Sequence, residues 1–224
     1  MESNFVEQTN HKRTILYQQP FLYGDFIPLR FIVNLEKFQS ELKKFDNNWV
    51  IYNRNKGDTG RLGLSVTSLD GEMTGVPDLQ SLYEHAQTTG QSFSENQFNK
   101  PTAAFRHLTS LHEVLNYFEG GLGRCRVIKF RAGGFFPPHR DQSINFQIPD
   151  YFRIFIPLSG TGENQLYFIY EDRKIFYEPG RAYLFNALKP HSVFSMVDNA
   201  CTFAMSLQLN HRNVELAIKS FLIK

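Results

Sequence analysis

The sequence contains only two cysteines, Cys125 and Cys201, and one tryptophan among its 224 residues. Two cysteines in a chain without a recognisable secretion signal predict reduced thiols rather than a disulfide framework. No stretch approaches the roughly 18 apolar residues that a membrane-spanning helix requires. The net charge of +2 is too small to indicate binding to nucleic acid or to an anionic membrane. We therefore expect a soluble, cytoplasmic protein.

Aromatic residues, by contrast, are abundant, with 22 phenylalanines and 10 tyrosines. They favour β-strands and sizeable side-chain pockets. From residue 125 onward, short apolar segments alternate with turn residues, which is typical of a β-sandwich or β-barrel. The predicted strands of this region are 125–130, 151–160, 165–170, 173–178, 181–186, 191–197 and 201–209.

Residues 1–120 mix predicted helices and strands. In segment 34–45 the apolar residues recur at helical spacing with charges between them. Without internal repeats or a linker, the whole chain, 1–224, is expected to form one domain in which these helices cover an outer face of a sheet. The other segments expected here and at the end of the chain are strands at 49–55 and 61–71 and helices at 76–87, 109–121 and 212–223.

The stretch FFPPHRDQ at residues 135–142 ends an apolar run with His139 and Asp141. On an extended strand residues i and i+2 point to the same face, so this imidazole and carboxylate converge. His191 follows a predicted strand and a proline, and can supply a third ligand. Two histidines and one carboxylate suit non-haem Fe(II) and O₂ chemistry. A lone histidine and aspartate two apart also occur in surface turns, so an incidental pair remains an alternative.

A resemblance to a known family covers about residues 124–209 and rests on three stretches: RVIKFRAGGFFPPHRDQ, YFRIFIPLSG and FYEPGRAYLFNALKPHSVF. They resemble the Fe(II)/2-oxoglutarate oxygenases, in particular the aspartyl/asparaginyl β-hydroxylase-like branch that includes L-proline cis-4-hydroxylases. Aspartyl β-hydroxylases proper lack the carboxylate ligand, so Asp141 makes the chain more similar to the proline hydroxylases.

This resemblance implies a mainly β fold with flanking helices, namely a cupin-like jelly roll or double-stranded β-helix. Its core would be residues 124–209, preceded by a mixed α/β elaboration at 1–120 and followed by a C-terminal helix at 212–224. The resemblance further implies that Fe(II) is held by three residues and that 2-oxoglutarate and O₂ are cosubstrates. The implied metal ligands, which would also be the catalytic residues, are His139, Asp141 and His191.

In this branch an arginine on the last strand usually binds the far carboxylate of 2-oxoglutarate. The corresponding positions here are Cys201 and Thr202, and neither is basic. We predict that Arg153 replaces the missing arginine, because it shares a strand face with Tyr151 and Phe155 and a charge among apolar groups needs a partner. The further candidates for 2-oxoglutarate binding are Lys129, Arg131, Arg181 and the hydroxyl of Thr202.

Three functional hypotheses follow from the sequence. The favoured one is a 2-oxoglutarate-dependent oxygenase, or hydroxylase, that acts on an amino acid, a peptide or another small polar molecule. The others are a cupin-like metal-binding protein or metalloenzyme that does not use 2-oxoglutarate, and a structural β-sandwich. No nucleic-acid or membrane partner is expected, and the sequence does not indicate an oligomeric state. The residues of the predicted hairpin that we expect near the substrate are Trp49, Asn53, Arg54 and Arg61.

Overall fold

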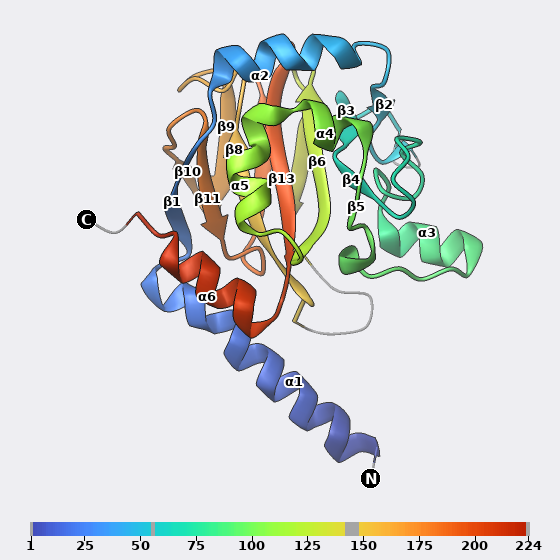
Figure 1. Ribbon diagram of the computed structural model, residues 1–224, viewed down its shortest axis with the longest axis vertical. Helices are drawn as coiled ribbons and strands as arrows, with labels where there is room; N and C mark the ends of the chain where they lie inside the picture. The colour runs from blue at the N-terminus through green and yellow to red at the C-terminus, as the bar shows by residue number, and fades with distance from the viewer. Residues whose placement is uncertain (1, 55–56, 142–147, 223–224) are drawn as a thin grey trace.

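The computed structural model describes residues 2–54, 57–141 and 148–222. Its described strands form a seven-stranded sheet, a four-stranded sheet and a two-stranded ribbon (Figure 1). The strands of the seven-stranded sheet are β1 (Phe26–Ile32), β2 (Val50–Ile51), β3 (Arg61–Ser65), β6 (Leu122–Phe130), β8 (Tyr151–Pro157), β11 (Arg181–Phe185) and β13 (Ala200–Gln208). The strands of the four-stranded sheet are β7 (Phe135–His139), β9 (Leu166–Tyr170), β10 (Arg173–Ile175) and β12 (His191–Ser195). The ribbon pairs β4 (Thr67–Ser68) with β5 (Lys100–Pro101).

The order of the strands identifies the fold. The larger sheet runs β1-β11-β8-β13-β6-β3-β2 and the smaller sheet runs β10-β9-β12-β7, so the chain from β6 to β13 passes repeatedly between the two. Four strands of the larger sheet, in the order β11-β8-β13-β6, thus form one half of the fold and the smaller sheet forms the other. This is the arrangement of a double-stranded β-helix, or jelly roll. The predicted fold class is therefore confirmed.

The larger sheet is buried on both faces. Along β8, Ile154 belongs to a hydrophobic cluster shared with the helices, whereas Phe155 belongs to a second cluster shared with the smaller sheet. Because side chains alternate along a strand, Arg153 points to the same side as Phe155, which is the inside of the jelly roll. The predicted parity of this strand is therefore confirmed, and it places Arg153 inside.

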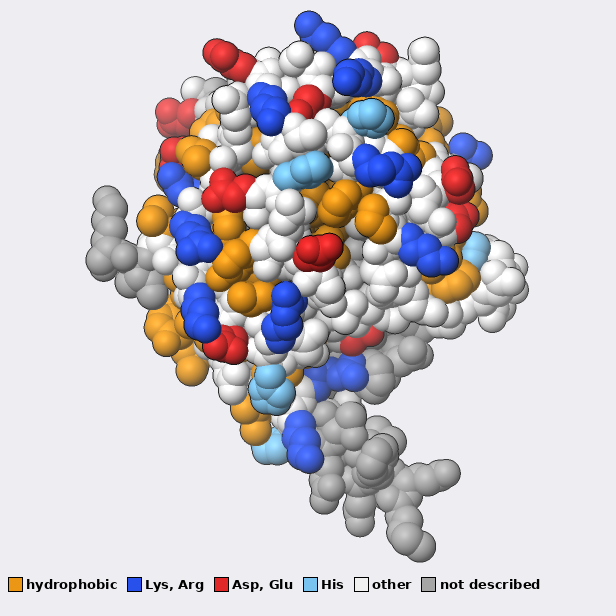
Figure 2. Space-filling view, viewed as in Figure 1, with side chains coloured by type: hydrophobic (Ala, Val, Ile, Leu, Met, Phe, Trp, Pro, Cys, Tyr) orange, Lys and Arg blue, Asp and Glu red, His pale blue; other side chains and the backbone are white. Residues whose placement is uncertain are grey.

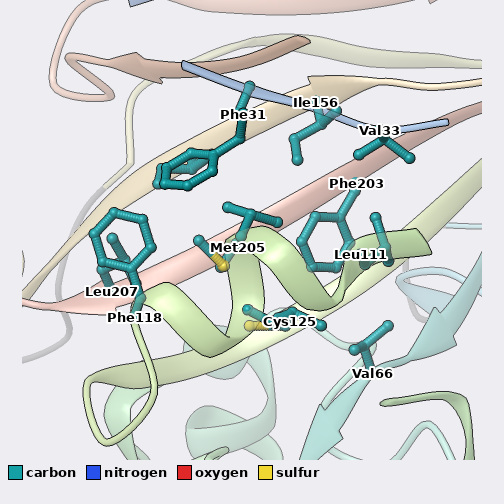
Figure 3. Close-up of a cluster of buried hydrophobic side chains, with 14 of the residues drawn as sticks. Phe31, Val33, Val66, Leu111, Phe118, Cys125, Ile156, Phe203, Met205 and Leu207 are labelled. Carbon is teal, nitrogen blue, oxygen red and sulfur yellow. The ribbon is translucent and has the colours of Figure 1, made fainter. Parts of the chain in front are cut away.

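Helices cover the outer face of the larger sheet. In Figure 1, α4 and α5 cross this face and α6 lies near its lower end, while α1 extends away from the sheets. Figure 3 shows Leu111 and Phe118, which flank the helix α5, against Phe203 and Met205 of β13. The bounds are α1 (Glu2–Gln18), α2 (Leu35–Leu42), α3 (Leu82–Thr89), α4 (Ala103–His107), α5 (His112–Tyr117) and α6 (His211–Lys219), with shorter 3₁₀ helices η1 (Gln19–Tyr23), η2 (Lys43–Phe45), η4 (Glu95–Gln97) and η5 (Thr109–Leu111).

Several elements differ from the prediction, among them α1, β1 and α3. The sequence analysis gave no helix for α1, whose apolar residues form no clear stripe along one side, and it missed β1 at the edge of the larger sheet. It also started the third helix at residue 76, whereas α3 begins after Ser81, whose side chain accepts a hydrogen bond from the backbone amide of Glu84. Parts of two predicted elements, residue 55 and residue 223, lie outside the described residues.

Cys125 and Cys201 are buried and form no disulfide, as predicted. In the described part of the chain, no helix has both the length and the apolar character needed to cross a membrane. Figure 2 shows basic and acidic side chains interspersed over the face on which α4 and α5 lie.

The hydrophobic cluster between the larger sheet and the helices depends on Phe203, which is 0% exposed and pairs with Val127 and Ile156 on the neighbouring strands. Phe203→Ala is expected to lower the free energy of unfolding by about 3–5 kcal/mol, because it removes buried apolar surface and leaves a cavity. Urea unfolding measures the change. The control, Phe194→Ala, removes a side chain that is 40% exposed and should have a much smaller effect; equal losses would contradict this assignment of the core.

Candidate metal centre

Two histidines face each other across neighbouring strands of the smaller sheet. His139, at the end of β7, pairs directly with His191, at the start of β12. Their ring centroids are 4.2 Å apart. The antiparallel register thus brings together two residues that are far apart in the sequence, and it places both imidazoles on one side of the sheet.

Backbone carbonyl groups orient both imidazoles. Nδ1 of His139 lies 2.8 Å from the carbonyl oxygen of Pro137, and Nδ1 of His191 lies 2.9 Å from that of Lys189. A carbonyl can only accept, so each Nδ1 carries the proton and each Nε2 keeps its lone pair in the neutral ring. Burial lowers the pKa of His191 to about 4, so this ring is neutral at pH 7. A neutral, oriented imidazole is the form that binds a metal ion.

Asp141 adds the carboxylate. Its backbone amide donates to the carbonyl oxygen of Ala187 at 2.8 Å. Nε and Nη2 of Arg153 donate to its Oδ2 at 3.1 and 2.7 Å, while its Oδ1 lies 3.7 Å from Nε2 of His139. Burial would raise the pKa of Asp141, but the charge and hydrogen bonds of Arg153 together with the two neighbouring histidines outweigh burial and hold the pKa below its ordinary value. One oxygen of a charged carboxylate therefore remains available beside the histidines.

The three side chains together form a plausible set of ligands for one metal ion. A ligand atom from each of His139, Asp141 and His191 lies within 4.8 Å of the other two. Two imidazole nitrogens and one carboxylate oxygen fit the facial arrangement used by non-haem Fe(II). The three ligand atoms suit such an ion because none of them carries a proton.

The N-terminal part of the chain supports the loop that carries His191. Asp25, just before β1, accepts from Nζ of Lys189 at 2.5 Å and from the side-chain amide of Asn186 at 3.1 Å. Tyr170 on β9 donates to the carbonyl oxygen of Asn186 at 2.9 Å. These contacts fix residues 186–190, so the second histidine is positioned by elements outside the jelly roll as well as within it.

A cavity of about 360 Å³ opens beside the candidate ligands. His139, Asp141 and Arg153 lie in one part of its wall. Residues of the N-terminal part of the chain form another, among them Tyr52 and Tyr83. Polar groups therefore surround a space large enough for a small molecule, next to the candidate metal ligands.

Glu95, on η4, is a buried carboxylate in the wall of the cavity that binds side chains from several strands. It forms ion pairs with Arg124 and, at 3.3 Å, with Arg153, and it accepts from the hydroxyl of Ser206 at 2.6 Å. Burial would raise its pKa, but the charges of Arg124 and Arg153 hold the pKa well below its ordinary value. Gly123 on β6 makes room for η4, since a Cβ there would lie 2.9 Å from the backbone oxygen of Glu95.

The sequence analysis missed Glu95 and the arginines of β6. The segment SENQ shows the capping box that starts η4, but nothing in it indicates that Glu95 points inward. Arg124 and Arg126 did have a signal. They share the parity of Ile128, which belongs to the cluster inside the jelly roll, and two arginines on an inward face indicate a polar cavity.

The structure brings together only some of the residues predicted to bind 2-oxoglutarate. Arg153 lies beside the candidate ligands, in contact with Asp141. Thr202 is buried on β13 and pairs with Ile128 of the inner cluster, but it does not line the cavity. Lys129 lies outside the cavity, because its parity is opposite to that of Ile128 and its Nζ lies 4.1 Å from the ring centroid of Trp49. The 2-oxoglutarate roles of Arg153 and Thr202 remain predictions.

The weaker candidates have other partners. Arg131 forms an exposed ion pair with Asp58, and Arg181 forms one with Glu178 at 2.5 Å. Among the residues expected near the substrate, Asn53 and Arg61 line the cavity, whereas Trp49 and Arg54 do not.

Comparisons with known proteins add little. No family model and no curated protein matches the sequence. The structure is similar to KdgF from Halomonas sp. (15% identity, 42% of this chain and 74% of that one, TM-score 0.31). It is also similar to a cupin superfamily protein from Desulfitobacterium hafniense (13% identity, 40% of this chain and 70% of that one, TM-score 0.30). A third similar structure is salicylate 1,2-dioxygenase from Pseudoaminobacter salicylatoxidans (16% identity, 38% of this chain and 20% of that one, TM-score 0.30). At such TM-scores the fold assignment rests on the strand order.

The contact between Arg153 and Asp141 generates a prediction about metal affinity. Arg153→Ala is expected to weaken binding of Fe(II) or Mn(II) by about 10–100-fold, because the carboxylate loses the group that orients it. Arg153→Lys keeps the positive charge but loses the bidentate geometry of the guanidinium group, and it should weaken binding less. Anaerobic titration measures the affinities. Arg131→Ala, outside the cavity, is the control, and unchanged affinity in Arg153→Ala would show that Asp141 needs no such support.

A second prediction concerns Glu95. Glu95→Gln is expected to lower the free energy of unfolding by about 3–5 kcal/mol at pH 7, because buried arginines lose their counter-charge. Since the folded state lowers the pKa of Glu95, its stabilisation is complete above the ordinary value of 4.5 and is lost as the pH falls below it. Urea unfolding at pH 7 and pH 4 should therefore give a smaller difference at pH 4.

The control for this experiment is Glu215→Gln, which removes an exposed carboxylate paired with Lys219 on α6. It should leave stability nearly unchanged at both pH values. A loss of the same size in both variants, or a difference that grows toward pH 4, would contradict the role assigned to Glu95.

Proposed function

We propose that this protein is a metal-dependent oxygenase that uses Fe(II), O₂ and 2-oxoglutarate to oxidise a small polar molecule, such as an amino acid or a short peptide. The observation that carries the proposal is the arrangement of His139, Asp141 and His191. His139 and His191 lie on the paired strands β7 and β12 of the jelly roll, and Asp141 follows directly after β7. The same residues carry the resemblance to the 2-oxoglutarate oxygenases in the sequence.

The chain's own residues would perform three tasks around such an ion. His139, His191 and Oδ1 of Asp141 would hold Fe(II), which with bound 2-oxoglutarate would supply the oxidising chemistry. Arg153 keeps Asp141 charged and turned toward the histidines. The aromatic rings of Phe168 and Phe185, packed around His191, exclude water from one side of the centre.

A second candidate function is a cupin-like metalloenzyme that does not use 2-oxoglutarate. The donors of Arg153 already have partners in this chain: Nε and Nη2 bind Asp141, and Nη1 binds Ser206 and Glu95. The last strand offers only Cys201 and Thr202 where the related enzymes carry an arginine. Arg153 would therefore have to exchange a partner, or another arginine would have to bind the far carboxylate.

Anaerobic titration distinguishes the two candidates. Fe(II) and 2-oxoglutarate together are expected to give a weak visible charge-transfer band, and neither should give it alone. In air the wild type should then convert 2-oxoglutarate to succinate, as followed by NMR. His191→Ala is expected to lose metal binding, band and succinate, because only two ligands remain.

Two other results would reject parts of the proposal. Metal binding that does not respond to 2-oxoglutarate would favour the second candidate. Stoichiometric iron in a His139→Ala/His191→Ala double variant would show that the metal lies elsewhere.

A further inference from the structure

Three arginines in the wall of the cavity, Arg61, Arg124 and Arg126, each have a buried polar atom without a partner among the described residues. Arg124 also forms a close ion pair with Glu95, so the other two are the ones whose charge is least compensated. Arg61 on β3 is 2% exposed and Arg126 on β6 is 6% exposed. Nη1 of Arg61 and Nε of Arg126 are buried and have no hydrogen-bond partner among the described residues. Unpaired polar atoms on a buried charge are unfavourable, so these atoms show that the described residues do not fully compensate the two guanidinium groups at the cavity wall.

Glu95 cannot neutralise these charges. Arg124, Arg153 and Ser206 already bind its two oxygens, and Arg126 approaches it only to 3.7 Å. Among the described residues, the one side chain that accepts a hydrogen bond from Arg61 is the neutral hydroxyl of Thr59. The charged residues lining the whole cavity are five arginines (Arg61, Arg124, Arg126, Arg140 and Arg153) and three acids (Glu95, Asp141 and Asp150), an excess of two positive charges (5 − 3).

Aromatic rings hold the two guanidinium groups in place. Arg61 lies 3.8 Å from the ring centroid of Phe136 and 5.2 Å from that of Tyr52, and Arg126 lies 5.9 Å from the Tyr52 centroid. Stacking covers the faces of a guanidinium group and leaves its N–H edges free for a bidentate anion.

The field inside the cavity is positive. Burial would raise the pKa of Tyr52, but the charges of Arg126, Arg124 and Arg61 outweigh it and lower the pKa below its ordinary value. Burial lowers the pKa of Arg61 to about 10, which leaves the guanidinium charged at pH 7.

These arginines lie close to the candidate metal centre. The ring of Phe136, on which Arg61 stacks, is itself 6.0 Å from the ring of His139. A small molecule whose acidic group is bound by Arg61 can therefore extend past Phe136 to the candidate ligands within the same cavity.

We propose that Arg61 and Arg126 form a subsite for an anionic group, a carboxylate or a phosphate, of a small molecule that reacts at His139, Asp141 and His191. The reaction rests on the proposed function, whereas the binding of the anion does not. The acidic group has two possible sources, the substrate itself or the far carboxylate of 2-oxoglutarate, for which the last strand carries no arginine.

Binding of simple anions to the metal-free chain tests the subsite. The probes are succinate and inorganic phosphate, titrated calorimetrically into protein freed of metal with a chelator. At least one should bind to the wild type, and the Arg61→Met/Arg126→Met variant should bind it at least tenfold more weakly, because methionine keeps the stacking volume but not the charge.

Arg30→Met is the matched control, since Arg30 also stacks on an aromatic ring, that of Tyr117 at 4.7 Å, but does not line the cavity. It should bind the anions as the wild type does. Absence of binding to the wild type, or equal binding to the double methionine variant, would overturn the proposal.

Stability gives an independent measurement. If an anion is the missing partner, the double methionine variant should melt no lower than the wild type in anion-free buffer, and succinate or phosphate should raise the melting temperature of the wild type alone. Should the double variant fail to fold, Arg61→Lys and Arg126→Lys keep the charge without the fork, and each should bind the anion more weakly than the wild type. Unchanged affinity in both lysine variants would reject bidentate binding.

Titration of 2-oxoglutarate in the presence of Mn(II) separates the two sources. If its affinity falls at least tenfold in the double methionine variant, and it competes with succinate or phosphate, the subsite binds the far carboxylate of 2-oxoglutarate. If its affinity is unchanged and the anion still binds to the ternary complex, the subsite belongs to the substrate. Anion binding without any 2-oxoglutarate binding would reject the proposed function and leave the subsite intact.

Discussion

The candidate site depends on Arg153, which joins two carboxylates, the half-buried Asp141 and the buried Glu95. One part of its guanidinium group orients Asp141, a candidate metal ligand, and another part binds Glu95, which belongs to the N-terminal part of the chain. Ser206 on the neighbouring strand β13 accepts from the same guanidinium group at 2.5 Å. An arginine can do this because its donors lie in a fixed plane and point in several directions. A shift of η4 would therefore reach Asp141, a candidate metal ligand, through a single side chain.

Burying so much charge is unfavourable unless each group has a partner, because desolvation of an ion costs several kcal/mol. Glu95 satisfies this requirement for Arg124 and Arg153 by sharing its two oxygens among them. Nε of Arg124, Nη1 of Arg61 and Nε of Arg126 nevertheless have no partner among the described residues. Every nitrogen of the Arg153 guanidinium group has a partner, whereas Arg126 approaches Glu95 only to 3.7 Å and the described residues give Arg61 no carboxylate. Such a difference is expected if Arg153 is structural and Arg61 and Arg126 meet a ligand.

Short apolar segments separated by turn residues predicted a β-sandwich or β-barrel, and the resemblance to the 2-oxoglutarate oxygenases implied the jelly roll. Along each strand the side chains alternate between the two faces with a period of two residues. The same period of two explains the position of Arg153 and the convergence of His139 and Asp141. By the same rule Lys129, one of the residues predicted to bind 2-oxoglutarate, points outward beside Trp49, while Arg126 on the same strand points inward.

Other features had no local signal. The position of Glu95 depends on packing against Gly123 and on the arginines of β6, which are distant in sequence. Asp25 likewise binds Lys189 only because β1 joins the edge of the larger sheet next to β11. Such contacts between distant segments decide how the N-terminal part of the chain meets the jelly roll, and no short pattern encodes them.

Two parts of the chain supply the wall of the cavity, and they suggest separate roles in chemistry and in recognition. The candidate metal ligands lie on or beside strands of the jelly roll, where antiparallel register fixes their separation. Much of the opposite wall, including Tyr52, Arg61 and Glu95, comes from the N-terminal part of the chain, where the backbone is joined by short strands and turns. Changes there can alter the shape and charge of the cavity without moving the strands that hold the histidines. Arg153 and Asp25 both couple the two parts, so a variant of the wall that preserves the Glu95–Arg153 and Asp25–Lys189 contacts can change which molecule binds while the candidate metal ligands stay in place.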